Sequence, residues 1–429
     1  MRQLFAMVKA SFWMFFVKAI GMGAAFLVTV IVGRNLGAGV LGDYGLALTI
    51  VAVLGLVTKF GTDKNIVRRI SQFELSEDND RLPQFLVSYY VSAFCLCALI
   101  ALVLYSAAGI LSFLTSESDK NKELFQLASL ALLSNTLIAT SSGILQARKH
   151  YFLSVLAQLT THQLILLAIL AFSISKIDSA ISLLLCYVIA NYVTLIACLL
   201  TIRKMNSPVG ISRQALRSYL SNGLKFHLDS RYLFSATAGG YLLGFIDILV
   251  ISYFYDSATL GVYIVVTRIG NTVGSILSTL NTYIAPNIAI LDQEFNIPKI
   301  KNLVFLCSIL AGFTALIFVI ILWIFGVEIL GIFGDEFKSG HTALLFVGLA
   351  QLINAVFGPC GQVMQMTNMQ PLILRLMLVT VSLNLILNII FVPIYGIAGA
   401  AFTTMLTNLL ANAWQFKHVY YGYFKRVRP

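Results

Sequence analysis

Twelve apolar stretches, each long enough to cross a bilayer as a helix, occupy most of this 429-residue chain. The hydrocarbon core of a bilayer is about 30 Å thick, so each crossing needs about 20 apolar residues. Inside lipid every backbone N–H and C=O must find its partner within the chain, and spans of this length therefore form helices. The connecting segments are too short for a separate soluble domain. We expect an all-α integral membrane protein whose function lies within or across the membrane.

A local repeat divides the chain into two halves. The predicted spans cover residues 11–33, 45–60, 85–107, 124–146, 153–174, 180–201, 228–254, 260–285, 303–326, 341–365, 372–392 and 396–416. The basic segment between spans six and seven suggests six-helix bundles at residues 1–212 and 213–429. Leu41-Gly42-Asp43-Tyr44 opens span two, and Leu260-Gly261-Val262-Tyr263 opens span eight 219 residues later. Both spans run in the same direction, which predicts a parallel pseudo-two-fold repeat, as in transporters whose substrate site lies between the halves.

The basic residues indicate how the chain lies in the membrane. Apolar residues make up 59% of the sequence and charged residues 11%, and the net charge is +11. Of the 29 Lys and Arg residues, 21 fall on one side of the predicted spans and 5 on the other. Basic segments stay in the cytoplasm, so both termini are predicted to be cytoplasmic. Topology and contact with anionic lipid thus account for the positive charge, and no nucleic-acid partner is expected.

Charged residues within the spans are the first candidates for a transport site. A charge at the bilayer centre costs about 2.5–3.5 kcal/mol on insertion scales, so it needs a reason to be there. Asp247 and Arg268 lie on spans seven and eight, which a short turn joins, and both sit roughly 10–12 Å below the outer face at 1.5 Å per residue. We expect both to face a central cavity, either paired or sharing a ligand. The alternative is an ion pair that only joins two helices.

Other polar residues within or beside the spans allow two interpretations each. Lys18 can reach the cavity or extend its amine to the inner headgroups. Arg231 lies near the inner end of span seven, where anchoring at the interface competes with a substrate role. Arg34, at the outer end of span one, can mark the interface alone. Asn384 and Asn388 share one face of span eleven, where hydrogen bonds between helices are the usual role and contact with a hydrophilic solute is the alternative.

Several segments resemble one transporter family. The segments that carry the resemblance are Ile31–Gly37 with Leu41–Ala47, Phe60–Gly61 with Ile66–Ile70, Ile246–Phe254 with Leu260–Tyr263, and Asn384–Asn388 with Pro393 and Tyr395–Ala401. They are similar to motifs of Wzx-type flippases, the polysaccharide-export branch of the multidrug/oligosaccharidyl-lipid/polysaccharide exporter superfamily. The motifs are degenerate singly, and together they cover both halves of the chain.

The resemblance implies a function and assigns residues to it. Asp247 matches the family's aspartate in span seven, Arg34 and Arg68 match its basic positions, and Arg268 falls where relatives often carry Lys or Arg. The implied cargo is an undecaprenyl-pyrophosphate-linked oligosaccharide, moved by alternating access from the cytoplasmic to the periplasmic leaflet of a bacterial inner membrane for O-antigen, lipopolysaccharide or other surface polysaccharide synthesis. The implied partners are this lipid-linked substrate, membrane lipids, and polysaccharide polymerase and chain-length proteins.

Two rival functions remain open at this stage. An ion-coupled multidrug antiporter of the same superfamily would use Asp247 as a proton- or sodium-binding carboxylate, but the several basic residues within the spans disfavour an acidic cavity for cationic drugs. A membrane-embedded glycan polymerase or ligase is disfavoured by the lack of a large outer loop. The sequence carries no nucleotide-binding, zinc-binding or triad motif. We therefore expect no catalytic residues, no metal and no cofactor.

Overall fold

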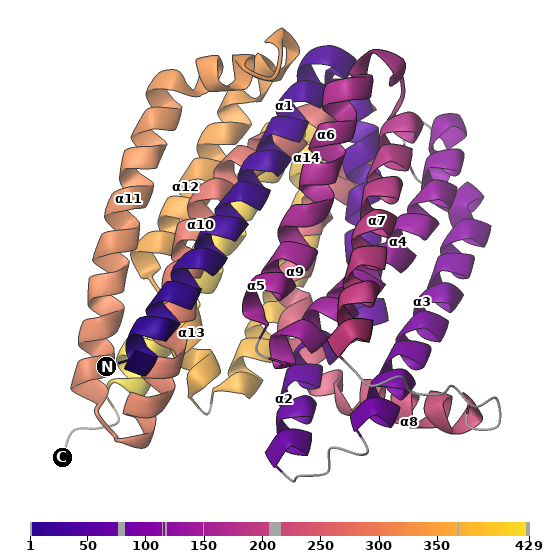
Figure 1. The fold of residues 1–429 in the computed structure, drawn as a ribbon. Coiled ribbons are helices and arrows are strands. Elements are labelled where there is room, and N and C mark those ends of the chain that lie inside the picture. The colour runs from indigo at the N-terminus through magenta and orange to yellow at the C-terminus, as the bar shows by residue number, and fades with distance from the viewer. Residues whose placement is uncertain are drawn as a thin grey trace. The chain divides into compact units, whose positions relative to one another are not determined.

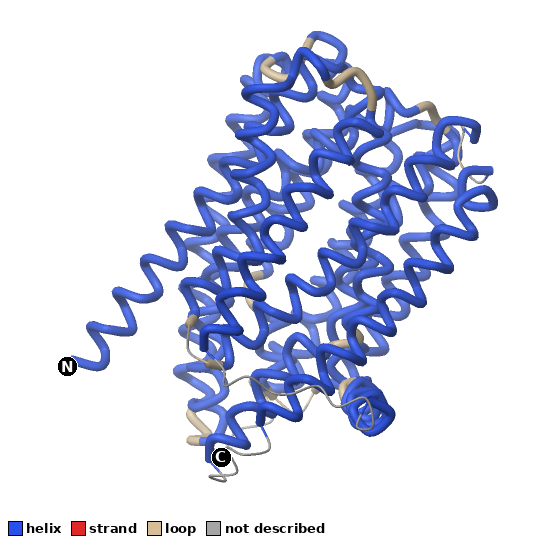
Figure 2. The backbone as a smooth tube through the Cα atoms, turned by 45° about the vertical axis from the view of Figure 1, so that its right-hand side comes forward, coloured by secondary structure: helices blue, strands red, loops and turns tan. Residues whose placement is uncertain are grey.

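The computed structural model describes residues 2–75, 82–113, 115, 118–148, 150–205, 216–367 and 369–425, and these residues form helices without any strand (Figure 2). The elements in chain order are α1 (Arg2–Lys59), α2 (Thr62–Leu75), α3 (Leu82–Phe113), α4 (Ser118–Ala147), α5 (Tyr151–Val155), η1 (Leu156–Thr160), α6 (Thr161–Ser173), η2 (Ile174–Lys176), α7 (Ala180–Met205), α8 (Leu216–Asp229), α9 (Arg231–Phe254), α10 (Ser257–Gln293), α11 (Ile297–Gly331), η3 (Asp335–Gly340), α12 (His341–Phe357), α13 (Cys360–Met366), α14 (Gln370–Lys417) and η4 (His418–Tyr423) (Figure 1).

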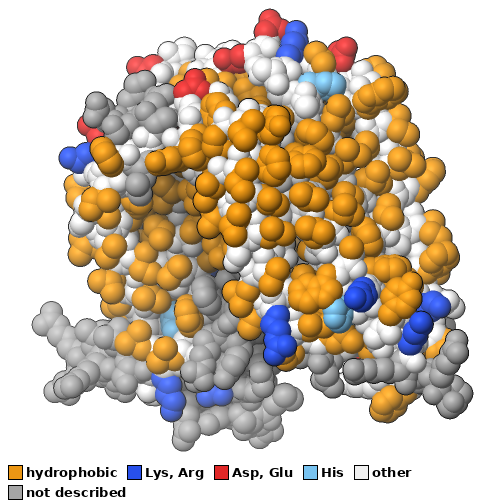
Figure 3. Space-filling view, turned by 180° about the vertical axis from the view of Figure 1, so that it is seen from behind, with side chains coloured by type: hydrophobic (Ala, Val, Ile, Leu, Met, Phe, Trp, Pro, Cys, Tyr) orange, Lys and Arg blue, Asp and Glu red, His pale blue; other side chains and the backbone are white. Residues whose placement is uncertain are grey.

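The helices have the length and composition of membrane spans. Among the described residues, eight helices are long and apolar enough to cross a bilayer. On the face drawn in Figure 3, apolar side chains cover the middle zone and charged side chains gather towards its ends. Large apolar side chains such as Trp323, which is 70% exposed, point outwards, as they do where the surrounding solvent is lipid. The prediction of an all-α membrane protein is confirmed, and the count of twelve spans stays a prediction.

The long helix α14 is a hairpin of two spans. Gly396 interrupts it with φ 60° and ψ −142°, three residues after Pro393. Asn384 and Thr407, which lie at nearly equal distances from Gly396, are joined by a side-chain hydrogen bond of 3.3 Å. In a straight helix these two residues would be about 35 Å apart, at 1.5 Å per residue. The chain therefore reverses at Gly396, between the predicted spans 372–392 and 396–416.

The chain contacts separate two compact units. The N-terminal unit comprises Met1–Leu36 and Asp43–Ala238, and the C-terminal unit comprises Gly37–Gly42 and Gly239–Pro429. Within the N-terminal unit α3 packs on α4, α4 packs on α7, and the amphipathic helix α8 lies against α3. Within the C-terminal unit α12 packs on α11, α10 and α14. The sequence-based boundary at residues 212 and 213 falls before α8, whereas the contacts place α8 and the start of α9 with the first unit.

The repeated glycine motifs meet in the C-terminal unit. A Cβ atom at Gly42 would overlap the carbonyl oxygen of Ser257, and a Cβ atom at Gly261 would overlap the carbonyl oxygen of Ala38. The 219-residue offset that relates Gly42 to Gly261 also relates Ala38 to Ser257. Each glycine thus packs on the residue four positions before the other, the reciprocal contact that two-fold-related copies of one motif make. Only a residue without a side chain allows the two backbones to approach so closely.

Candidate functional site

Asp247 is the centre of a buried polar cluster in the C-terminal unit. Its side chain, on α9, is 4% exposed and accepts hydrogen bonds from three neutral donors. The hydroxyls of Tyr263 and Thr404 donate to Oδ2 at 2.6 and 2.5 Å. The amide of Asn388 donates to Oδ1 at 2.8 Å. The carboxylate therefore joins α9 to α10 and to both halves of α14.

Two chain reversals bring these residues together. Asp247 and Tyr263 are each eight residues from Tyr255, in the turn between α9 and α10, and this symmetry sets them at the same depth. Asp256 caps α10 by accepting from the Thr259 N–H at 3.2 Å. In the same way, Asn388 and Thr404 are each eight residues from Gly396.

A single hydroxyl ties the two reversals to each other. Tyr255 Oη donates to the carbonyl oxygens of Val392 and Pro393, at 3.1 and 3.3 Å. In an unbroken helix these carbonyls would accept from the backbone N–H groups four residues ahead. The interruption at Gly396 removes those donors, so the carbonyls need a donor from elsewhere. The turn after α9 and the reversal of α14 are thereby held in register, and the positions of Asp247, Tyr263 and Thr404 follow from that register.

The asparagine pair extends the cluster along α14. Besides Asp247, the Asn388 amide nitrogen contacts the backbone oxygen of Asn384 at 3.0 Å and its side-chain oxygen at 3.2 Å. Asn384 in turn donates to Thr407 on the other half of the hairpin. Both predicted asparagines thus bond to other spans. Asn388 Oδ1 is buried and accepts no hydrogen bond from the described part of the chain. It is a spare oxygen acceptor beside the carboxylate.

The arrangement suits a proton or a small hard cation. A carboxylate buried among neutral donors in a membrane is stable only if its charge is offset, by protonation or by a bound cation. The oxygens of Asp247, Asn388 and Thr404 are the type of ligand that hard cations prefer. Thr404 is half-buried, so the cluster is not sealed on that side. Among the described residues no three His, Cys, Asp or Glu side chains form a group that could hold a metal ion.

Arg268 is on α10, five residues after Tyr263. The hydrogen bonds to the Asp247 carboxylate come from hydroxyl and amide donors, and the pairing of Arg268 with Asp247 stays a prediction. Arg268 follows Tyr263 by five residues, about 140° around the helix, so the two side chains leave α10 in different directions. Its side chain is half-buried. A role for Arg268 in binding the substrate remains a prediction.

The remaining basic candidates belong to the N-terminal unit. Lys18 is half-buried and Arg34 is exposed, both on α1. The side chains of Arg68, on α2, and Arg231, at the start of α9, lie outside the described residues. The structure gathers Asp247, Asn384 and Asn388 into one cluster of the C-terminal unit. The roles of the four basic residues stay predictions.

Sequence reasoning missed Tyr263 and Thr404 as members of the cluster. Tyr263 belongs to the glycine-containing repeat motif, where its hydroxyl gave no sign of a buried acceptor. Thr404 lies one residue after Thr403 and three before Thr407, in a span that otherwise looks apolar. The symmetry of the two reversals could have identified both residues. Tyr263 and Asp247 are equally distant from Tyr255, and Thr404 and Asn388 are equally distant from Gly396.

Comparison with known proteins agrees on one class. A family model described as polysaccharide biosynthesis protein matches residues 7–291. Two similar curated proteins come from Haloferax volcanii. The probable low-salt glycan biosynthesis flippase Agl15 is 26% identical over 203 residues, 46% of this chain and 42% of the relative. The probable flippase AglR is 21% identical over 170 residues, 39% of this chain and 36% of the relative. Each match thus spans less than half of the relative's length.

Solved structures show the same architecture. The lipid II flippase MurJ, in an inward closed conformation, superposes with a TM-score of 0.75 at 14% identity, covering 96% of this chain and 87% of MurJ. An inward-facing multidrug resistance MATE family transporter of the MOP superfamily superposes with a TM-score of 0.64 at 14% identity, covering 98% of this chain and all of the transporter. At this identity the likeness establishes the fold.

Proposed function

Since this chain belongs to the polysaccharide biosynthesis protein family, we propose that it is a flippase that moves an undecaprenyl-pyrophosphate-linked oligosaccharide repeat unit from the cytoplasmic to the periplasmic leaflet. The family match over residues 7–291 carries this proposal. The glycan biosynthesis flippase Agl15 and the transporter fold support it. The cytoplasmic termini rest on the distribution of Lys and Arg along the sequence, and the bacterial inner membrane and the periplasmic destination rest on the resemblance to Wzx-type flippases.

The cargo explains why such a protein keeps polar groups in its spans. A pyrophosphate joined to sugars cannot cross hydrocarbon unaided, because its charges and hydroxyls would lose their hydration. We assign Arg268, Lys18, Arg231, Arg34 and Arg68 to the recognition of the pyrophosphate. Arginine suits this role because its planar guanidinium can donate two parallel hydrogen bonds to phosphate oxygens.

The Asp247 cluster is assigned to energy coupling. The carboxylate on α9 accepts from donors on α10 and on both halves of α14. Binding or release of a proton or cation by this carboxylate therefore changes the hydrogen bonds among three elements at once. A proton or sodium ion bound there would favour one packing of these helices, and its release would favour another. A ligand shifts such an equilibrium only by its difference in affinity for the two states, and the buried carboxylate supplies that difference.

Deleting the gene and measuring lipid-linked repeat units tests the cargo. The flippase proposal expects these units to accumulate on the cytoplasmic leaflet, where an added membrane-impermeant glycosidase cannot reach them in intact spheroplasts. Re-expression of the chain should restore access. Normal surface polysaccharide in the deletion strain would contradict the proposal. Increased sensitivity to cationic drugs with normal polysaccharide would instead support the antiporter of the same superfamily.

Coupling is tested with purified protein in proteoliposomes. Glycan-lipid translocation is followed under an imposed proton or sodium gradient for the native chain and for Asp247→Asn. The assignment expects a gradient-dependent component that the variant lacks. A gradient response equal in the two proteins would contradict it.

A further inference from the structure

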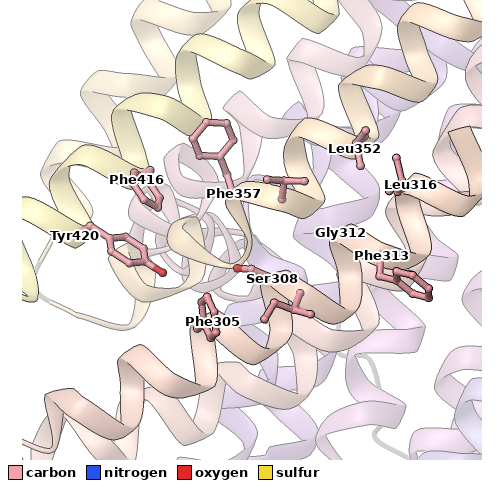
Figure 4. Close-up of a pocket in the computed structure, with 11 residues that line it drawn as sticks. Phe305, Ser308, Gly312, Phe313, Leu316, Leu352, Phe357, Phe416 and Tyr420 are labelled. Carbon is pink, nitrogen blue, oxygen red and sulfur yellow. The ribbon is translucent and has the colours of Figure 1, made fainter.

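An apolar groove lies in the C-terminal unit. It lies between α11, α12 and the junction of α14 with η4, and its volume is about 630 Å³ (Figure 4). The aromatic rings of Phe305, Phe313, Phe357, Phe416 and Tyr420 line it. Phe416 and Tyr420 stack with their ring centroids 4.1 Å apart, which makes a flat wall on the side of α14 and η4.

Two glycines create the groove. α12 ends at Phe357 because Gly358 adopts a positive φ of 68°, and the chain then turns away into α13. Gly358 packs so closely on Ser308 that a Cβ atom there would overlap the serine hydroxyl. Gly312, one turn after Ser308 on α11, forms the floor, and its nearest neighbour across the groove is Val356. A large residue at position 312 would fill the space.

The side chains around the groove are of the kind that faces hydrocarbon. α11 belongs to the most apolar candidate span, with a mean hydropathy of 2.8, and Phe305 and Phe313 are 56% and 63% exposed. Because the exposed neighbours are apolar along the whole stripe, the molecule that fills this groove in a membrane is the chain of a lipid. At roughly 30 Å³ for a water-sized group, the volume holds about 20 heavy atoms, or about four isoprene units.

One end of the groove carries polar and basic groups. Figure 4 shows the hydroxyls of Ser308 and Tyr420 pointing toward one another from α11 and η4. Lys301 is exposed one turn before Phe305, on the same face of α11. The Tyr423 hydroxyl bonds to Asp292 and thereby brings the end of η4 beside the start of α11. Lys299 and Lys301 lie in the first turns of α11, and Lys417 and Lys425 flank η4. Asp292 lies in the last turn of α10, and Glu294 follows it in the turn before α11.

We propose that this groove binds the polyprenyl chain of a polyprenyl phosphate or pyrophosphate, with its phosphate end near Lys301. An isoprene unit contains a rigid trisubstituted alkene and a methyl branch, so it loses less conformational freedom on binding than a saturated acyl segment. The ring faces of the five aromatic side chains offer a broad surface for such branched, unsaturated groups. The inference rests on the proposed function for the identity of the lipid, and it adds a tail-binding site to it.

The experiment is photo-crosslinking of the full chain in lipid nanodiscs with a diazirine-labelled polyprenyl phosphate that carries no glycan. We expect labelled peptides from α11, α12 and η4, and competition by unlabelled polyprenyl phosphate at concentrations where phosphatidylglycerol does not compete. Gly312→Phe should reduce labelling at least fivefold. Gly312→Ala is the matched control, because its Cβ would lie 3.4 Å from Val356 and leave the groove open. Lys301→Gln should weaken labelling by the phosphate but not by the uncharged polyprenol.

Three outcomes overturn the proposal. Labelling of the native chain elsewhere would exclude this groove, whether or not Gly312→Phe folds. Equal competition by phosphatidylglycerol would make it a site for any bilayer lipid. Equal labelling of Gly312→Phe and Gly312→Ala, both folded, would show that the chain does not enter the groove. The assay needs no translocation, so groove labelling in a chain whose deletion leaves polysaccharide normal would refute the flippase and not the groove.

Discussion

Replacing Asp247 in two ways separates its structural role from its role in coupling. Asp247→Leu removes the acceptor of three hydrogen bonds. The donors that lose it are the hydroxyls of Tyr263 and Thr404 and the amide of Asn388. Hydrogen bonds between membrane helices contribute about 0.6 kcal/mol on average and up to about 1.7 kcal/mol. Loss of three should therefore lower the free energy of unfolding by about 2–5 kcal/mol.

Asp247→Asn should be far milder. One amide oxygen can still accept from Tyr263 and Thr404, while the new NH2 group faces Asn388. Rotation of the Asn388 amide would present Oδ1, which has no partner in the described structure, to that donor. The rotation gives up the contacts of Asn388 with Asn384, so the net loss should be about one hydrogen bond, roughly 1 kcal/mol.

Unfolding in a graded detergent or denaturant series, followed by intrinsic fluorescence, measures the stability of both variants. Translocation in proteoliposomes measures their coupling. The expected pattern is a destabilised Asp247→Leu and a nearly native Asp247→Asn that has lost its response to the ion gradient. An Asp247→Leu chain as stable as the native one would refute the hydrogen-bond reasoning, and a gradient response in Asp247→Asn would refute the coupling role.

Three further predictions test other parts of the structure. Gly396→Ala should destabilise the C-terminal unit by about 1 kcal/mol or more, because φ 60° is strained for a residue with a Cβ atom. The measurement is the unfolding midpoint, compared with that of Gly109→Ala, since Gly109 has open space around it. Gly261→Ala should force α10 from the backbone at Ala38 and reduce transport severalfold, whereas Gly244→Ala, which also has open space, should not; transport at matched expression is the measurement. Burial lowers the pKa of His227 on α8, so docking of α8 on α3 should be complete above about pH 6.5 and weaken as the pH falls through the lowered native pKa; hydrogen exchange in α8 at pH 7.5 and 5.0 tests this, and His227→Gln should remove the dependence.

The sequence predicts depth in the membrane better than direction around a helix. Counting back from Phe254 and forward from Leu260 predicted Asp247 and Arg268 at similar depth, and the hydropathy pattern located the spans. The same count could not tell that the Tyr263 hydroxyl donates to Asp247 on α9, because depth does not fix direction around a helix. A shift of five residues changes height by about 7.5 Å but direction by about 140°. The direction depends on packing, which no local pattern records.

The reversal at Gly396 shows what additional rule would have recovered the cluster. Asn384 and Asn388 were predicted to share a face of one span, and that much follows from a spacing of four. Their partners on the next span are fixed only when the point of reversal is known, since a residue eight before Gly396 meets one eight after it. Pro393 and Gly396 mark that point in the sequence. A rule that pairs residues across it would have named Thr404.

The two copies of the repeat share a buried tyrosine but differ at the position of Asp247. Tyr263 has its counterpart in Tyr44, at the same 219-residue offset, and both tyrosines are buried. Asp247 has its counterpart in Val28, which is buried and apolar. The tyrosine follows the compared position by sixteen residues in both copies. A fold needs the glycine contacts and the tyrosine in both copies, whereas a carboxylate in lipid is retained only where its charge is used. The break in the repeat, more than the repeat, therefore points to Asp247.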